Sequence, residues 1–254
     1  MKTTLLPLLL AGTAVCAAEA LPKGDCARPA ARRDLSHCDL SQRKFAGQDL
    51  AGARFAGAKL DNADFRKARL SGTDFSGASA KWVNFTGADL KAADFRKADL
   101  FHASFDEADL SDARLQEANL FGANLIATRA VRADFSAAYL KDVLMEGIDL
   151  TGGSIRGCYA FRGVFAGGRL VGADLSGADL TGAALEGVDF SGATLKGTKL
   201  LGAALRHARF FQADLEGADF SNADLWQADL SGARHLPPSA MEAYIEPFVV
   251  RERR

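Results

Sequence analysis

The sequence lacks any apolar run long enough to cross a membrane, and neither sign of charge is in excess. Its main apolar stretch, residues 5–14, is about half of the ~20 residues that a spanning helix needs. Lysine and arginine total 31 against 32 acidic residues, which gives a formal net charge of −1. No basic stripe is present, so direct nucleic-acid binding is not expected.

Histidine and cysteine are scarce, with four of each, and none of them has the spacing of a zinc site. No histidine is paired by spacing with a serine, and the glycine-rich segment 147–157 does not match a phosphate-binding loop. The many aspartates follow a short repeat, which is typical of a solvated surface ladder. We therefore predict a protein that is not an enzyme and that needs no metal or cofactor.

A strict five-residue period is the dominant pattern of the chain. Every fifth residue from Leu35 to Leu230 is leucine or phenylalanine, with five exceptions and no slip in register; the exceptions are Ala80, Ala130, Met145, Ile155 and Ala160. A helix would spread these residues around its whole circumference, since each step of five turns it by about 140°. A straight strand would point them alternately to opposite faces. The period therefore predicts a β-solenoid with a corner after every large residue.

The positions between the large residues indicate four sides per coil. A second column of small residues, usually alanine, lies two residues before each large one and shares its inward face. Fifteen residues per coil would stack like charges, for example Arg54 on Arg69 and Asp74 on Asp89. Twenty residues per coil alternate the signs, with Asp89 and Asp109 the one like pair in their column. Forty repeats would then form about ten coils.

These repeats resemble a known family. Ala-Asp-Leu-Ser-Gly at 173–177 and Ala-Asp-Phe-Ser-Asn at 218–222 resemble the A(D/N)LXX unit of pentapeptide-repeat proteins, and the resemblance covers residues 31–234. It implies an all-β fold, a right-handed quadrilateral β-helix that is often capped by helices. It does not imply a single activity.

The two ends of the chain depart from the repeat. A positive start, the apolar run and Ala18-Glu19-Ala20 predict a signal peptide at residues 1–20, and hence export to the periplasm or outside the cell; a lipoprotein at Cys16 is a weaker alternative because Val15 is bulky. Residues 21–30 are then an amino-terminal cap segment. Residues 235–254 predict a short helical cap over the last coil, using the apolar residues Met241, Tyr244, Ile245, Phe248 and Val249.

Two interpretations concern the remaining cysteines and the middle of the solenoid. Cys26 and Cys38 flank the start of the solenoid and are candidates for a disulfide, whereas Cys158 replaces an inward alanine and is interpreted as a buried, inert thiol. Between residues 143 and 168 the small positions hold valine, isoleucine, cysteine and glycine instead of alanine. This irregularity predicts a bend or bulge there.

Aromatic residues outside the core gather on one side. With four sides, this side carries outward aromatic or large apolar residues at seven positions: Trp82, Phe101, Phe121, Tyr139, Tyr159, Phe161 and Leu201. A contiguous stripe of this kind suggests a contact surface. The alternative interpretation is that the rings merely lie flat over neighbouring coils.

The leading hypothesis is an exported, non-enzymatic scaffold that binds another protein or forms a homodimer through the aromatic side. The alternative is a DNA mimic that binds and protects a type II topoisomerase, as the resemblance allows. DNA mimicry requires a strongly acidic face, because duplex DNA carries one charge every ~1.7 Å. The near-zero net charge and the predicted leader both disfavour it.

Overall fold

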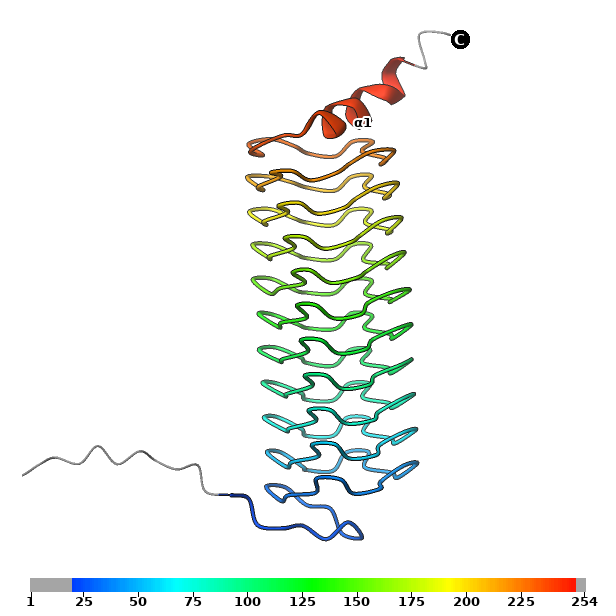
Figure 1. Ribbon diagram of the computed structural model, residues 1–254, viewed down its shortest axis with the longest axis vertical. Helices are drawn as coiled ribbons and strands as arrows, with labels where there is room; N and C mark the ends of the chain where they lie inside the picture. The colour runs from blue at the N-terminus through cyan, green and yellow to red at the C-terminus, as the bar shows by residue number, and fades with distance from the viewer. Residues whose placement is uncertain (1–19, 250–254) are drawn as a thin grey trace, which may run out of the picture.

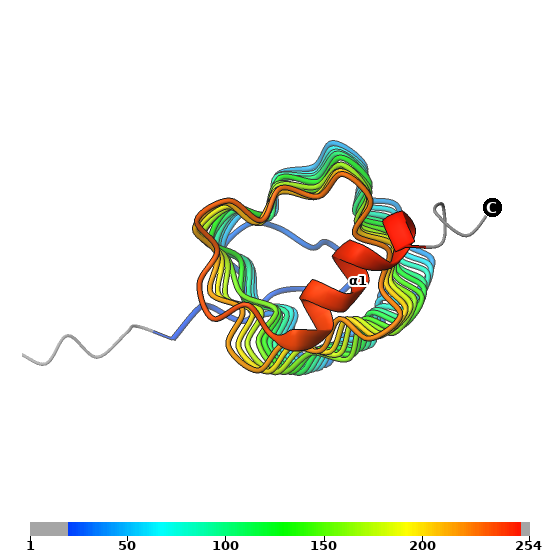
Figure 2. The same cartoon turned by 90° about the horizontal axis from the view of Figure 1, so that it is seen from above.

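The fold is a four-sided rod of stacked coils (Figure 1). The computed structural model describes residues 20–249, and side chains up to residue 243. Parallel β-bridges, one per five-residue repeat, join residues that are 20 positions apart, from Asp34↔Arg54 to Asp214↔Arg234. The end view shows the four sides in register along the rod (Figure 2). This register is the one that the charge columns predict.

Each corner is a tight turn closed by the residues on either side of it. In one example the amide of Ala53 donates to the carbonyl of Leu50 at 3.0 Å, and Gly52 between them has a φ of +64°. A left-handed residue at this position is the requirement of a type II turn, and glycine meets it without strain. The amide of Leu50 itself donates to Arg69 of the next coil at 2.9 Å. The hydrogen bonds within the turns and those between successive coils together pair the backbone amide and carbonyl groups.

The aspartate of the repeat stabilises the corner that follows it. The Asp174 carboxylate accepts a hydrogen bond from the Ser176 amide at 2.9 Å, and Asn84 does the same for Thr86 at 2.9 Å. Aspartate and asparagine are favoured here because their short side chains reach the backbone two residues ahead. The polar residue of the A(D/N)LXX unit thus contributes to turn geometry.

The core is a column of large side chains on each side of the rod. Phenylalanines one coil apart stack, with ring centroids 4.6 Å apart for Phe45 and Phe65 and 4.8 Å for Phe75 and Phe95. The two opposite phenylalanine columns also meet edge to face across the core, as for Phe75 and Phe85 at 5.5 Å. Stacked and edge-to-face pairs add to the stabilisation that burial provides.

The predicted bend between residues 143 and 168 is wrong. The bridges Leu144↔Val164 and Asp149↔Arg169 keep the register, and Figure 1 shows evenly stacked coils through this region. The reason is compensation between consecutive coils. A methyl group added at Gly163 would lie 3.3 Å from the Val143 side chain, so the missing methyl of one coil makes room for the extra volume of the previous one.

A crossing segment covers the first coil. Gly24 donates to the Asp34 carbonyl at 2.8 Å, and a Cβ at Gly24 would lie 2.6 Å from the Leu35 side chain, so this backbone rests on the end of the core. A disulfide joins Cys26 to Cys38, whose Cα atoms are 5.7 Å apart. The predicted signal peptide lies outside the described residues, apart from Ala20.

The helix α1, Pro238–Val249, lies across the last coil (Figure 2). The hydroxyl of Ser239 accepts a hydrogen bond from the otherwise free Phe220 amide at 3.1 Å, and the buried residues Ala240 and Ala243 pack on the core. Met241 does not cover the coil as the sequence suggested, because 46% of it is exposed. Small alanines let the helix approach closely, which a methionine would prevent. The side chains of the other four predicted cap residues lie outside the described part.

Candidate interaction surface

Six of the seven predicted aromatic-side residues form one continuous ring ladder on the surface. We call these residues the aromatic ladder: Trp82, Phe101, Phe121, Tyr139, Tyr159 and Phe161. The ring centroids of successive members lie 5.3, 5.4, 6.2, 5.4 and 6.1 Å apart in that order. The ladder crosses five successive coils, and consecutive members lie up to 20 positions apart in the sequence.

The ladder follows from the coil geometry. Phe101 and Phe121 occupy the same corner position one coil apart, and Tyr139 and Tyr159 are bridged partners in the middle of the same side. Stacked coils hold such residues at a separation close to the strand spacing of about 4.8 Å, which is near the distance at which aromatic rings stack. The repeat alone therefore aligns the rings.

Leu201 does not join the ladder. It occupies the corner column of Phe161 but lies two coils further on, with the polar Thr181 between them. Its side chain is 40% exposed. The structure thus separates this residue from the other six candidates.

Three residues that the sequence analysis did not single out complete the surface. The His102 ring lies 4.4 Å from Phe101 and 5.7 Å from Phe121, measured between centroids. The Lys141 ammonium lies 5.7 Å from the Phe121 ring centroid, and the Arg162 guanidinium lies 5.5 Å from that of Phe161. The sequence could have predicted these three residues, because they lie in the same 20-residue columns as ladder members. That prediction requires basic residues to be considered together with aromatic ones in each column.

The charges along the ladder are mostly paired within the chain. Lys81 lies 3.3 Å from Asp99, and the Arg162 side chain lies 2.7 Å from Asp142. Lys141 has no carboxylate within ion-pair distance among the described residues. The surface is therefore nearly neutral, with one cation available to a partner.

An acidic cluster at the carboxyl end of the solenoid is better explained as a structural network than as a metal site. Asp214, Glu216 and His235 bring their ligand atoms within 4.8 Å of one another. However, the Lys196 ammonium lies 3.5 Å from Asp214 and 2.8 Å from Glu216 and already provides a cation there. The hydrogen bond from His235, together with Lys196, holds the pKa of Asp214 below its ordinary value. The network ties the last bridged coil to the residue that begins the cap.

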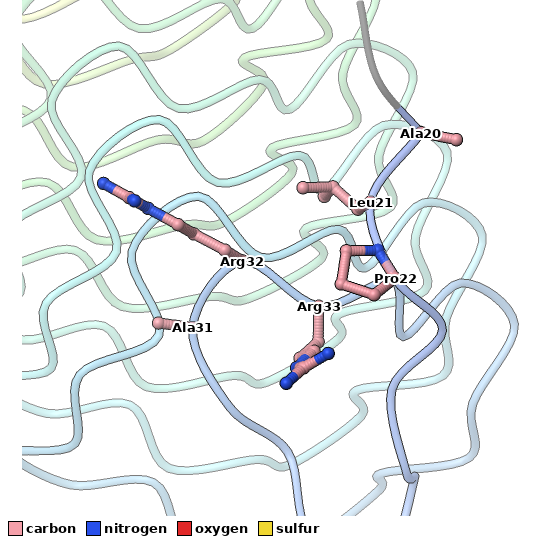
Figure 3. Close-up of a pocket in the computed structure, with 6 residues that line it drawn as sticks. All are labelled: Ala20, Leu21, Pro22, Ala31, Arg32 and Arg33. Atoms are coloured by element: carbon pink, nitrogen blue, oxygen red, sulfur yellow. The ribbon is translucent and has the colours of Figure 1, made fainter.

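A recess of about 380 Å³ lies beside the amino-terminal cap segment (Figure 3). Its lining is Ala20, Leu21, Pro22, Ala31, Arg32 and Arg33. The Arg32 and Arg33 side chains point in different directions in Figure 3, so no polar groups converge on a ligand there. We assign no function to this recess.

Cys158 has the surroundings of an unreactive thiol, as the sequence predicts. It is buried, and burial raises the pKa of its thiol to about 12. A thiol with such a pKa is almost entirely protonated at neutral pH and is a poor nucleophile.

Family models match most of the solenoid. A model described as a pentapeptide repeat region matches residues 31–105, and one described as pentapeptide repeats in eight copies matches residues 118–157, 164–199, 173–212 and 198–234. The chain therefore belongs to the pentapeptide-repeat family. No curated protein sequence matches it significantly.

Solved structures of the same family are similar to the chain. HetL, a pentapeptide-repeat protein involved in heterocyst differentiation regulation from the cyanobacterium Nostoc sp. strain PCC 7120, is 31% identical, with 78% of this chain and 89% of HetL covered and a TM-score of 0.42. Full-length QnrB1, a plasmid-mediated fluoroquinolone resistance protein, is 24% identical, with 81% and 96% covered and a TM-score of 0.33. Rfr23 from the cyanobacterium Cyanothece 51142 is 17% identical, with 79% and 89% covered and a TM-score of 0.23.

Proposed function

We propose that the protein is an exported, non-enzymatic scaffold that binds another protein, or a second copy of itself, through the aromatic ladder. The observation that carries this proposal is the ring-to-ring continuity of the ladder over five coils. Isolated exposed apolar residues are common on protein surfaces and need no explanation. A contiguous row of aromatic residues matches the enrichment of aromatic side chains in interface cores.

The size of the surface supports the proposal. Trp82, Tyr139 and Tyr159 are 51%, 40% and 38% exposed. Since a buried aromatic side chain covers 150–250 Å², these three alone present roughly 300 Å² to solvent. Patches of about this size and above are often functional on monomers. The rings do lean on neighbouring coils, but enough of each remains exposed to contact a partner.

Export is proposed from the amino-terminal sequence. Its basic start, apolar run and small residues near position 20 are typical of a leader that is removed after secretion. The Cys26–Cys38 disulfide suits an oxidising compartment. Among the described residues, no helix has the length and apolarity to span a membrane.

The charge pattern does not favour a DNA mimic. Columns of alternating sign place arginine next to aspartate, as in the pairs Arg69–Asp49 at 3.2 Å and Arg54–Asp74 at 3.3 Å. A mimic of a duplex requires a face of one sign. A supercoiling assay with the mature chain tests this alternative directly, and we expect no effect on topoisomerase activity.

The proposed surface is tested by replacing three aromatic residues of the ladder. The control replaces an exposed aromatic residue outside the ladder. In the variant, serine replaces Phe101, Phe121 and Phe161; in the control it replaces Phe211, a 43% exposed aromatic residue on another side. We expect the triple variant to lose self-association in light scattering, or partner capture from the periplasm, and the control to retain both. Thermal melts verify that both variants fold. If the triple variant associates and captures partners like the wild type, the ladder is not the interaction surface.

A further inference from the structure

The rings of the aromatic ladder have their flat faces occupied. Phe101 and Phe121 are parallel to within 6°, and Tyr139 and Tyr159 to within 20°. Phe121, Tyr139 and Tyr159 each have a stacked ring before and after them in the ladder. At the two ends Trp82 meets Phe101 edge to face and the Arg162 guanidinium lies over Phe161, while the Lys141 ammonium lies over Phe121. The ladder therefore presents ring edges, and not ring faces, to the solvent.

This orientation discriminates between classes of ligand. Sugars and nucleobases bind exposed aromatic residues by lying flat on a ring face, which is how stacking platforms work. The inner rings of this ladder offer no free face. Ring edges carry partial positive charge and suit a layer of apolar side chains, ring faces or acceptor oxygens. A partner protein provides such groups.

The spacing of the ladder identifies the kind of protein segment that fits. The two stacked pairs have centroid separations of 5.4 Å. An α-helix advances about 5.4 Å per turn, whereas residues on one face of an extended strand recur about every 6.8 Å. Over four coil steps of about 4.8–5.4 Å each, the turns of a helix fall out of register with the ladder by at most about 2 Å. The side chains of a strand fall out of register by about 6–8 Å, which is more than the spacing between coils.

Charge adds a second requirement on the partner. Lys141 has no carboxylate partner among the described residues, and its ammonium lies over the Phe121 ring in the middle of the ladder. An acidic side chain beside the apolar stripe of a helix would pair with it. Lys81 and Arg162, the neighbouring cations, already have carboxylates within the chain.

From these observations we propose that the aromatic ladder binds an amphipathic α-helix of a partner protein. The helix lies along the rod, with apolar residues at i, i+3 or i+4, and i+7 against successive coils and an acidic residue opposite Lys141. Such a helix has about 13 residues, because four coil steps span about 19 Å. This inference rests on the proposed function and specifies its partner.

The experiment maps the partner segment from three points along the ladder. The photo-crosslinking residue p-benzoylphenylalanine replaces Trp82, Phe121 or Phe161 in the full chain, in cells of the native host, and mass spectrometry locates each crosslinked residue. Neighbouring probes are two coils apart, about 9.6 Å. We expect the crosslinked sites on the partner to be spaced by six or seven residues per probe step, since 9.6 Å corresponds to about 6.4 helical residues. A probe at Phe211 serves as the control and should not crosslink to this segment.

The possible outcomes separate the two claims. A spacing of about three residues would indicate an extended segment and overturn the helix while leaving the interaction surface intact. Crosslinks to glycans or to a second copy of this chain overturn the partner helix as well. If the three probes crosslink nothing beyond the Phe211 control, both the surface and the helix are refuted.

A synthetic peptide of the mapped segment provides a second, independent readout. It should gain helical circular dichroism on binding, and Lys141→Glu should weaken its binding about fivefold at low salt, with a smaller effect at high salt. A peptide that binds without becoming helical contradicts the inference. Thermal melts of the Lys141→Glu variant confirm that it is folded.

Discussion

The compensation between Val143 and Gly163 leads to a quantitative prediction. Val143→Ala removes two buried methyl groups and should cost about 2 kcal/mol of local stability. Gly163→Ala adds a methyl group 3.3 Å from Val143 and 2.8 Å from the Phe165 ring. Overpacking of this kind lowers the free energy of unfolding by about 1–3 kcal/mol. The reduced entropy of the unfolded chain raises it by about 0.4–1 kcal/mol, so the net loss of stability is about 1 kcal/mol.

The double variant decides whether the two positions compensate each other. The methyl added at Gly163 fills part of the space that Val143→Ala opens, so the combined loss should be about 2 kcal/mol and not the additive value of about 3. Native-state hydrogen exchange of peptides spanning residues 141–166 measures it locally, because the stability of a solenoid is approximately a sum over neighbouring repeats.

The matched control combines Val143→Ala with Gly153→Ala. Gly153 lies on the opposite side of the coil, and a Cβ there would contact Leu150 and Ala133 instead of Val143. This pair should be additive within about 0.5 kcal/mol. Equal coupling in both pairs, or additivity in both, would refute the idea that volume exchange between coils keeps this region straight.

Three further predictions concern charge and the amino-terminal cap. Burial raises the pKa of Asp94, but hydrogen bonds and charge from Arg96 more than offset this and hold it below its ordinary value. The ion pair therefore stabilises the fold above about pH 4 and is lost on acidification, so melting temperatures should be flat from pH 8 to 5 and fall below pH 4, less steeply in Asp94→Asn. Reduction of the Cys26–Cys38 disulfide should lower the stability of the first coil by about 3 kcal/mol in hydrogen exchange; alkylation of both thiols in the oxidised protein would contradict the bond. Lys91 lies 3.3 Å from Asp109 and 3.8 Å from Asp89, two aspartates that face each other on successive coils. Lys91→Met should therefore lower stability by up to about 1 kcal/mol at low salt and by nothing measurable in 1 M salt.

The architecture was predictable because one period governs the whole core. A five-residue spacing of large residues excludes a helix and a straight strand, and the signs of the charge columns select 20 residues per coil over 15. The observed bridges, such as Asp49↔Arg69, follow that register. The stacked phenylalanine columns follow as well, because residues 20 positions apart on one side must meet.

The irregular region was misread because composition was judged one position at a time. Valine and isoleucine at small positions suggest strain, and glycine suggests looseness, so together they favoured a bend. The structure places Val143 against Gly163 and Ile148 against Gly168, each pair one coil apart. Summing volumes along each 20-residue column would have indicated a straight rod. The exposure of Met241 has a similar origin, since the apolar pattern of α1 does not reveal that Ala240 and Ala243 approach the last coil.

The aromatic residues were predictable as a set, but their orientation was not, and orientation determines what the surface can bind. A sequence column places rings on one side; only side-chain packing shows whether their faces or their edges meet the solvent. Because Phe121 lies between Phe101 and Lys141, its faces are no longer available for a flat ligand. Removing Lys141 would take away the cation over Phe121 without changing the spacing of the ladder, and Phe101 and Tyr139 would still stack on that ring. Lys141→Ala should therefore weaken an acidic helical partner and leave the binding of flat ligands such as oligosaccharides at a low level. The opposite pattern, in which glycans bind the wild-type ladder and lose affinity in this variant, would mean that the cation supports sugar recognition and that the edge-on interpretation of the ladder is wrong.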